Sequence, residues 1–139
     1  MEEQQTHHTP ISGEKFLREI LRGRRDFSWI DLEEGFNLRE HPLFKQVNEY
    51  LRSQDLKYNP INLTGARLRY LRARGLYMPY FSGRNVNLQR AFLRNSDLRG
   101  SNLWDACLEN AYLRKAVLSD TNLSHANLED ANLRNTNLT

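Results

Sequence analysis

Arginine and aromatic side chains recur at twenty-residue intervals in the second half of this chain. Two such columns, two positions apart, are Arg72, Phe92, Tyr112 and Asn132, and Arg74, Arg94, Arg114 and Arg134. If residues twenty positions apart lie side by side, guanidinium groups form a ladder beside aromatic rings, and such a surface attracts anionic groups. We therefore predict an interaction face made of Arg72, Arg74, Phe92, Arg94, Tyr112, Arg114 and Arg134. The alternative is a solvated face without a partner, because arginine is frequent at this position of the pattern.

Residues that support metal binding or covalent catalysis are sparse. The four histidines are His7, His8, His41 and His125, and none has a cysteine or carboxylate at ligand spacing. Cys107 is the single cysteine, so no intrachain disulfide can form, and its outward place in the pattern favours a surface thiol over a nucleophile. The sequence contains no Gly-rich phosphate loop and no nucleophile elbow. We expect no metal, no cofactor and no enzymatic activity.

A five-residue repeat must position the predicted face. Leucine occupies thirteen of the sixteen positions taken at intervals of five from Leu63 to Leu138, and the residue two before each is uncharged. The exceptions occur in the pairs Leu71–Ala73, Leu76–Met78 and Phe81–Gly83. In each pair the larger volume has moved to the earlier position, an exchange that packed interiors tolerate. Both positions are therefore predicted to point inward.

A period of five fits neither the 2.0-residue period of a strand nor the 3.6-residue period of a helix. It fits a solenoid in which each unit forms one side of a four-sided coil and equivalent residues stack at about 4.8 Å. Residues 56–139 would make about four regular coils, with the register beginning at Leu56 and Tyr58.

The repeat units resemble the pentapeptide-repeat family. Typical units are Ala-Asn-Leu-Glu-Asp at 126–130, Ala-Asn-Leu-Arg-Asn at 131–135 and Ser-Asp-Leu-Arg-Gly at 96–100. The resemblance implies an all-β solenoid, specifically a right-handed quadrilateral β-helix. The segment from Arg25 to Leu32 also resembles the opening coil of family members. In a first irregular coil over residues 25–40, Phe27, Leu32 and Leu38 would point inward, with one extra residue between the last two.

Two helices are predicted before the regular coils. Phe16, Leu17, Ile20 and Leu21 fall on one helical stripe behind Ser12, which predicts an N-terminal capping helix within residues 11–24. A second apolar face predicts a helix inserted at residues 41–55, formed by Leu43, Phe44, Val47, Tyr50 and Leu51. Residues 1–10 are polar and are expected to form a disordered tail.

Composition favours one soluble domain, since 39% of the 139 residues are hydrophobic and 27% are charged. The polar, acidic start does not resemble a secretory signal, and no apolar run approaches the roughly 20 residues of a transmembrane helix. We therefore expect a cytoplasmic protein that does not bind membranes.

Charge is distributed unevenly along the chain. Residues 61–99 contain eight arginines and one aspartate, a net charge of +7, whereas residues 1–60 and 100–139 each sum to −2. These observations favour a noncatalytic scaffold or protein-interaction module whose unknown partner docks on the predicted face or on the inserted helix. The resemblance also suggests a gyrase-binding DNA mimic, but mimicry needs an acidic surface and residues 61–139 sum to +5.

A further alternative is weak, nonspecific binding of nucleic acid or another polyanion through the arginines. Four stacked residues span only about 14 Å, a short footprint on a duplex with one charge per ~1.7 Å. The inward leucines of the C-terminal coil would be open to another chain, so we expect either self-association through this coil or that the sequence is part of a longer repeat protein. These leucines are Leu123, Leu128, Leu133 and Leu138.

Overall fold

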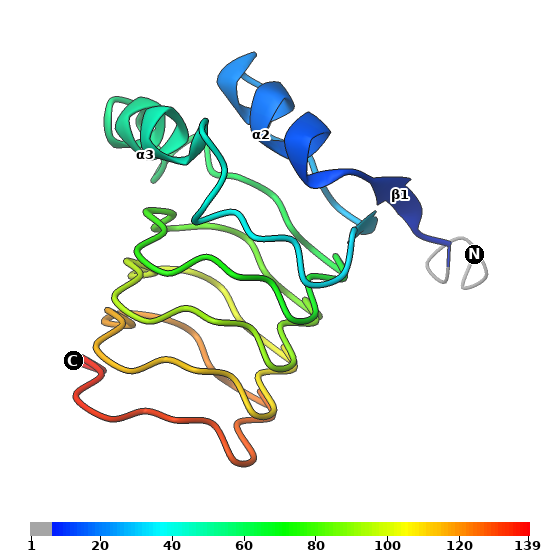
Figure 1. Ribbon diagram of the computed structural model, residues 1–139. Coiled ribbons are helices and arrows are strands. Elements are labelled where there is room, and N and C mark those ends of the chain that lie inside the picture. Colours follow the sequence, from blue (N-terminus) through cyan, green and yellow to red (C-terminus); the bar gives the residue numbers. More distant parts are fainter. Residues whose placement is uncertain (1–6) are drawn as a thin grey trace.

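Parallel pairing between residues twenty positions apart builds the structure. In the computed structural model, which describes residues 7–139, Asn62 pairs with Ser82 and Ser82 with Asn102, and equivalent pairs occur every five residues up to Asn137. Leu63 N–H donates to Ser82 C=O at 2.7 Å, and Ser82 N–H donates to Ile61 C=O at 3.0 Å. Four such pairings complete one turn, so the chain winds as a four-sided coil (Figure 1).

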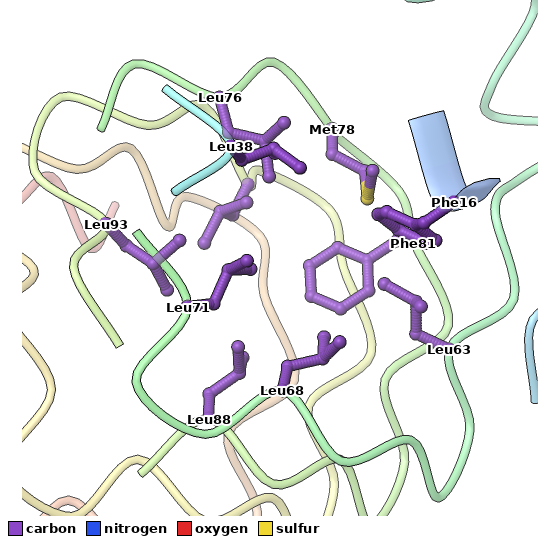
Figure 2. A pocket seen from close by; sticks show the side chains of 11 residues that line it. Phe16, Leu38, Leu63, Leu68, Leu71, Leu76, Met78, Phe81, Leu88 and Leu93 are labelled. Atoms are coloured by element: carbon purple, nitrogen blue, oxygen red, sulfur yellow. The ribbon is translucent and has the colours of Figure 1, made fainter. Parts of the chain in front are cut away.

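The two inward columns of the repeat form the core. From Ile61 to Leu118 the residues of both columns are buried, including the serines at positions 96 and 101. Figure 2 shows the leucines of successive coils and Phe81 directed into the interior around a cavity of about 20 Å³ lined only by apolar side chains. A Cβ on Gly83 would lie 2.5 Å from Phe81 Cε2, so the large ring requires the missing side chain.

The other repeat positions turn the corners. Thr64 N–H donates to Asn62 Oδ1 at 3.0 Å, and Trp104 N–H donates to Asn102 Oδ1 at 3.1 Å, so asparagine before the leucine satisfies the amide after it. Every fifth residue from 65 to 135 has a positive φ. Glycine, asparagine and aspartate tolerate this conformation best, and they predominate there.

The first coil carries one extra residue, as its pairings show. Asp26 pairs with Asn62 and Asp31 with Arg67, whereas Asn37 pairs with Arg72. The sequence separation between paired residues is therefore one residue shorter on the third side, which places the extra residue between the second and third sides of the first coil. Inward residues of this coil, Phe27, Leu32 and Leu38, are buried.

A short strand covers one side of the first coil. Strand β1 (Thr9–Ile11) pairs in parallel with β2 (Ile30–Leu32), which belongs to that coil. The sequence placed Thr9 and Pro10 in a disordered tail, and this differs from the structure because the strand depends on pairing with β2 rather than on a local pattern. Residues 1–6 of the expected tail lie outside the described residues.

Two helices lie over the first coil at the end opposite the C-terminus (Figure 1). Helix α2 (Gly13–Leu21) begins after Ser12, whose Oγ accepts the Lys15 N–H at 3.1 Å. Its buried Phe16 meets Phe27 of the first coil edge to face, with ring centroids 4.9 Å apart. Helix α3 (Phe44–Arg52) buries Phe44, Val47 and Leu51. The helices thereby cover the apolar end of the solenoid.

Asn48 of α3 pairs with the edge of the solenoid. Its Nδ2 donates to Gly75 C=O at 3.0 Å, and its Oδ1 accepts the Tyr77 N–H at 2.9 Å. Because a side-chain amide has the same donor and acceptor as a peptide group, it substitutes for backbone pairing on the fourth side of the first coil. The helix therefore continues the hydrogen-bond pattern that the coil interrupts.

The regular register begins later than the sequence indicated. Leu56 is buried, but Tyr58, predicted to point inward, is 79% exposed. The first regular pairing is at Asn62, because residues 53–59 form turns that lead from α3 into the coil.

The inward register predicts a large difference between neighbouring substitutions. Leu98→Ala removes a side chain that is 2% exposed and should lower the free energy of unfolding by about 2–5 kcal/mol. Arg99→Ala removes an exposed ion pair with Asp97 and should cost less than about 1 kcal/mol. Urea denaturation measures both, and equal effects would contradict the register.

Because the Asn48 amide bridges helix α3 and the coil, the substitution Asn48→Asp is expected to lower the stability of the fold. The carboxylate retains an acceptor for Tyr77 N–H but places oxygen against Gly75 C=O, so the free energy of unfolding should fall by about 1–3 kcal/mol. Gln46→Asp introduces the same side chain on the exposed face of α3 and is the matched control. Similar urea midpoints for the two variants would show that the amide does not bridge helix and coil.

Candidate functional site

The coil places all seven predicted site residues on one face, named here the arginine face: Arg72, Arg74, Phe92, Arg94, Tyr112, Arg114 and Arg134. Backbone pairs align the first column, because Arg72 pairs with Phe92 and Phe92 with Tyr112. Hydrogen bonds align the second column. Gly75 N–H donates to Arg94 C=O at 2.9 Å, and Lys115 N–H donates to Arg134 C=O at 2.9 Å. The twenty-residue spacing therefore becomes two adjacent rows along the solenoid axis.

Phe92 and Tyr112 form a parallel ring stack at the centre of this face. Their centroids are 4.7 Å apart with an interplanar angle of 3°, and the Arg72 Cζ lies 5.9 Å from the Phe92 centroid. The two residues are 38% and 46% exposed. Since the ring that stacks on Phe92 is Tyr112, and Arg72 lies over the other side, the surface of Phe92 that remains for a partner is mainly its edge. Ring edges carry partial positive charge.

The arginine face holds the whole net positive charge of the solenoid. Together with Lys115 at the following corner it carries six basic and no acidic residues, whereas the other positions of residues 61–139 carry five basic and six acidic residues. Like charges in a column disfavour one another, and an anionic partner would relieve that repulsion.

Three of the five solenoid arginines on the other faces have carboxylate partners, whereas Arg84 and Arg90 only contact rings, 4.9 Å from the Trp104 centroid and 5.9 Å from the Tyr70 centroid. Arg67 lies 3.5 Å from Asp31, Arg69 lies 3.8 Å from Glu34, and Arg99 lies 3.3 Å from Asp97. A side-chain hydrogen bond with Tyr77, helped by the Asp97 charge, raises the pKa of Arg99 above its usual value.

Guanidinium groups of the arginine face lack such partners. Within residues 7–139 none of its five arginines forms an ion pair with a carboxylate. The Nε atoms of Arg94 and Arg114 are buried and make no hydrogen bond to any described residue. The face therefore differs from the three arginines that pair with Asp31, Glu34 and Asp97, and within residues 7–139 only Arg94 and Arg114 have a buried Nε without a hydrogen bond.

A surface hollow continues the arginine face toward the first coil. Arg72, Arg74 and Phe92 line it together with Asn37, Arg39 and Glu40. The sequence did not point to the last three residues, because the irregular first coil hides their alignment with the regular repeat.

The other candidate chemical groups lie apart from this face. Cys107 is a half-buried free thiol on the second side of the coil. His8 contacts Gly65 C=O at 2.9 Å, and His41 contacts Glu14 at 3.4 Å. Over the part of the chain that the structure describes, no three His, Cys, Asp or Glu side chains gather as a metal site would require.

Two further observations bear on partners. None of the helices within residues 7–139 has the length and apolar character needed to cross a bilayer. In the last coil Leu123, Leu128 and Leu133 are half-buried and Leu138 is 53% exposed. Self-association through this coil stays a prediction.

Comparisons with known proteins identify the repeat. Residues 84–114 and 108–139 match the family model for pentapeptide repeats, with eight copies. The crystal structure of alr5209, a pentapeptide repeat protein from Nostoc Pcc 7120, is similar at 26% identity and a TM-score of 0.56, over 94% of this chain and 79% of that one. This likeness includes the segments before the regular coils and, with the family match, implies a right-handed quadrilateral β-helix.

Two other solved structures are similar over different extents. HetL, a pentapeptide repeat protein from Nostoc sp. strain PCC 7120 involved in heterocyst differentiation regulation, is 33% identical with a TM-score of 0.34, over 54% of this chain and 37% of that one. Rfr23, a pentapeptide repeat protein from the cyanobacterium Cyanothece 51142, is 22% identical with a TM-score of 0.33, over 91% of this chain and 99% of that one. No curated protein sequence matches the chain.

Proposed function

Because the chain belongs to the pentapeptide-repeat family, we propose that it is a noncatalytic scaffold that docks a protein partner on the arginine face. The observation that carries this proposal is the column of arginines without carboxylate partners in residues 7–139, beside the exposed Phe92–Tyr112 stack. Aromatic and arginine side chains are the residues most enriched where protein interfaces gain their binding energy.

The fold supports the proposal by holding the face rigid. Arg72, Phe92 and Tyr112 each follow a buried inward residue, and their backbones pair with the coils on either side. Ordering these side chains on binding therefore costs no backbone entropy, which favours affinity. The face would act as a prearranged surface rather than a flexible loop.

The charge of this face argues against the DNA-mimic alternative. A mimic of duplex DNA presents negative charge, whereas six basic residues gather on and beside the arginine face. The face would attract an acidic partner and repel one that recognises phosphates.

Nucleic-acid binding is the second candidate, favoured by the same arginines. Single-stranded bases bind by stacking on the faces of aromatic rings. Phe92 is covered by Tyr112 at 4.7 Å and by Arg72, so little of the Phe92 ring face is left for a base. This arrangement favours a protein partner.

The proposal predicts that Arg94→Glu combined with Arg114→Glu preserves the fold and abolishes partner capture. Charge reversal would repel an acidic surface while leaving both buried columns unchanged. The experiment is affinity capture from cell extract, with unfolding by urea as the folding check. Arg84→Glu combined with Arg90→Glu is the control, since it changes net charge equally at exposed positions outside the face.

Proteins retained by the wild type and the control but lost by the face variant would support the proposal. If all three retain the same proteins, the arginine face is a solvated surface and helix α3 becomes the candidate docking element.

A further inference from the structure

The arginine ladder has a fixed spacing that a partner must match. Arg74, Arg94, Arg114 and Arg134 stand on successive coils, and the C=O of each of the last three accepts the N–H of the residue that follows the preceding arginine. Neighbouring strands lie about 4.8 Å apart, so the four Cα atoms fall at roughly 0, 4.8, 9.6 and 14.4 Å along the axis. A partner that pairs with all four needs four acidic groups in a line at nearly this interval.

An α-helix supplies such a line. With a rise of 1.5 Å per residue, positions i, i+3, i+7 and i+10 lie on one face at about 0, 4.5, 10.5 and 15 Å. Along the axis, each of these helix positions falls within about 1 Å of one of the four arginine Cα positions. A single acidic helix can therefore face all four arginines at once.

An extended segment fits less well. Side chains on one face of a strand recur at about 6.7 Å, so only three of them fit along the four arginines. The middle one then lies between the positions of Arg94 and Arg114. The mismatch leaves one guanidinium without a partner.

We propose that the arginine face binds an acidic α-helix of another protein, laid along the solenoid axis with carboxylates at i, i+3, i+7 and i+10. This inference rests on the proposed docking function and adds the chemistry and shape of the partner. Charge complementarity favours an acidic partner, because the face and its corner carry six basic and no acidic residues, and the spacing of the ladder favours a helix. The positive edges of Phe92 and Tyr112 lie beside the ladder and favour the same acidic groups.

The hollow at the N-terminal end of the face lies where the helix would pass Arg74. Glu40 is the one carboxylate among its lining residues, which include Arg72 and Arg74. Arg39 lines the same hollow, and because Asn37 pairs with Arg72 it lies level with Arg74, so an acidic helix extended past Arg74 would meet this arginine as well as Glu40.

The test uses the full chain and two synthetic peptides of identical composition. One carries glutamates at i, i+3, i+7 and i+10 of an alanine-rich helix, and the other carries them at i, i+2, i+4 and i+6. Fluorescence anisotropy at low salt should show the first peptide binding at least about tenfold more tightly, since it alone pairs with four arginines. A short DNA duplex labelled in the same way is the third probe.

Arg94→Glu combined with Arg114→Glu should weaken binding of the first peptide by at least about tenfold, whereas Arg84→Glu combined with Arg90→Glu should change it by less than about threefold. Arg114→Lys keeps the charge and should retain most of the affinity, which separates charge pairing from a folding defect.

Equal affinities for the two peptides would overturn the helical partner, as would tighter binding of the duplex through the same arginines. Failure of both peptides to bind the wild type would also overturn it. None of these results alters the capture experiment, whose dependence on Arg94 and Arg114 tests the docking function separately.

Discussion

The parallel hydrogen bonds between peptide groups twenty residues apart are the constraint on which the rest of the structure depends. They fix each five-residue unit as one side of a coil, so that two side chains of every unit point inward and the others are ordered into rows on the surface. The core is consequently narrow, and one large residue such as Phe81 must be matched by a missing side chain at Gly83. The same register that buries the leucines aligns Arg94 with Arg114, and core and candidate site are therefore two consequences of one pattern.

A stack of coils has ends, and its N-terminal end needs a cover made of different elements. Helices α2 and α3 supply apolar side chains, and β1 adds a strand beside the first coil. Asn48 shows how a helix can meet an interrupted coil, since its amide takes up Gly75 C=O and Tyr77 N–H. These contacts bury apolar side chains and also give hydrogen-bond partners to backbone groups of the coil. Helices α2 and α3 and strand β1 therefore hold the first coil in register with the regular coils that carry the arginine face.

The sequence predicted the features that follow from periodicity. The leucine column, the exchanged volumes at Phe81 and Gly83 and the alignment of the site columns all depend on spacing alone. The corner geometry was also visible in principle, because glycine, asparagine and aspartate recur two positions after the leucine, as at Gly65, Asn95 and Asp105. Strand β1, the exposure of Tyr58 and the hydrogen bonds of Asn48 could not be predicted, since each depends on which irregular segment packs against the first coil. The unpaired state of the arginines likewise required the positions of all neighbouring carboxylates.

Site-resolved hydrogen exchange of backbone amides tests the five-residue register most directly. Asn102 N–H donates to Phe81 C=O and Leu103 N–H donates to Asn122 C=O, whereas Trp104 N–H is bound only by the side chain of Asn102. The amides of Asn102 and Leu103 should therefore exchange at least about tenfold more slowly than that of Trp104, and this contrast should recur every five residues through the coils. Protection of Trp104 equal to that of Leu103, or protection with a helical period, would contradict the register and with it the arginine face.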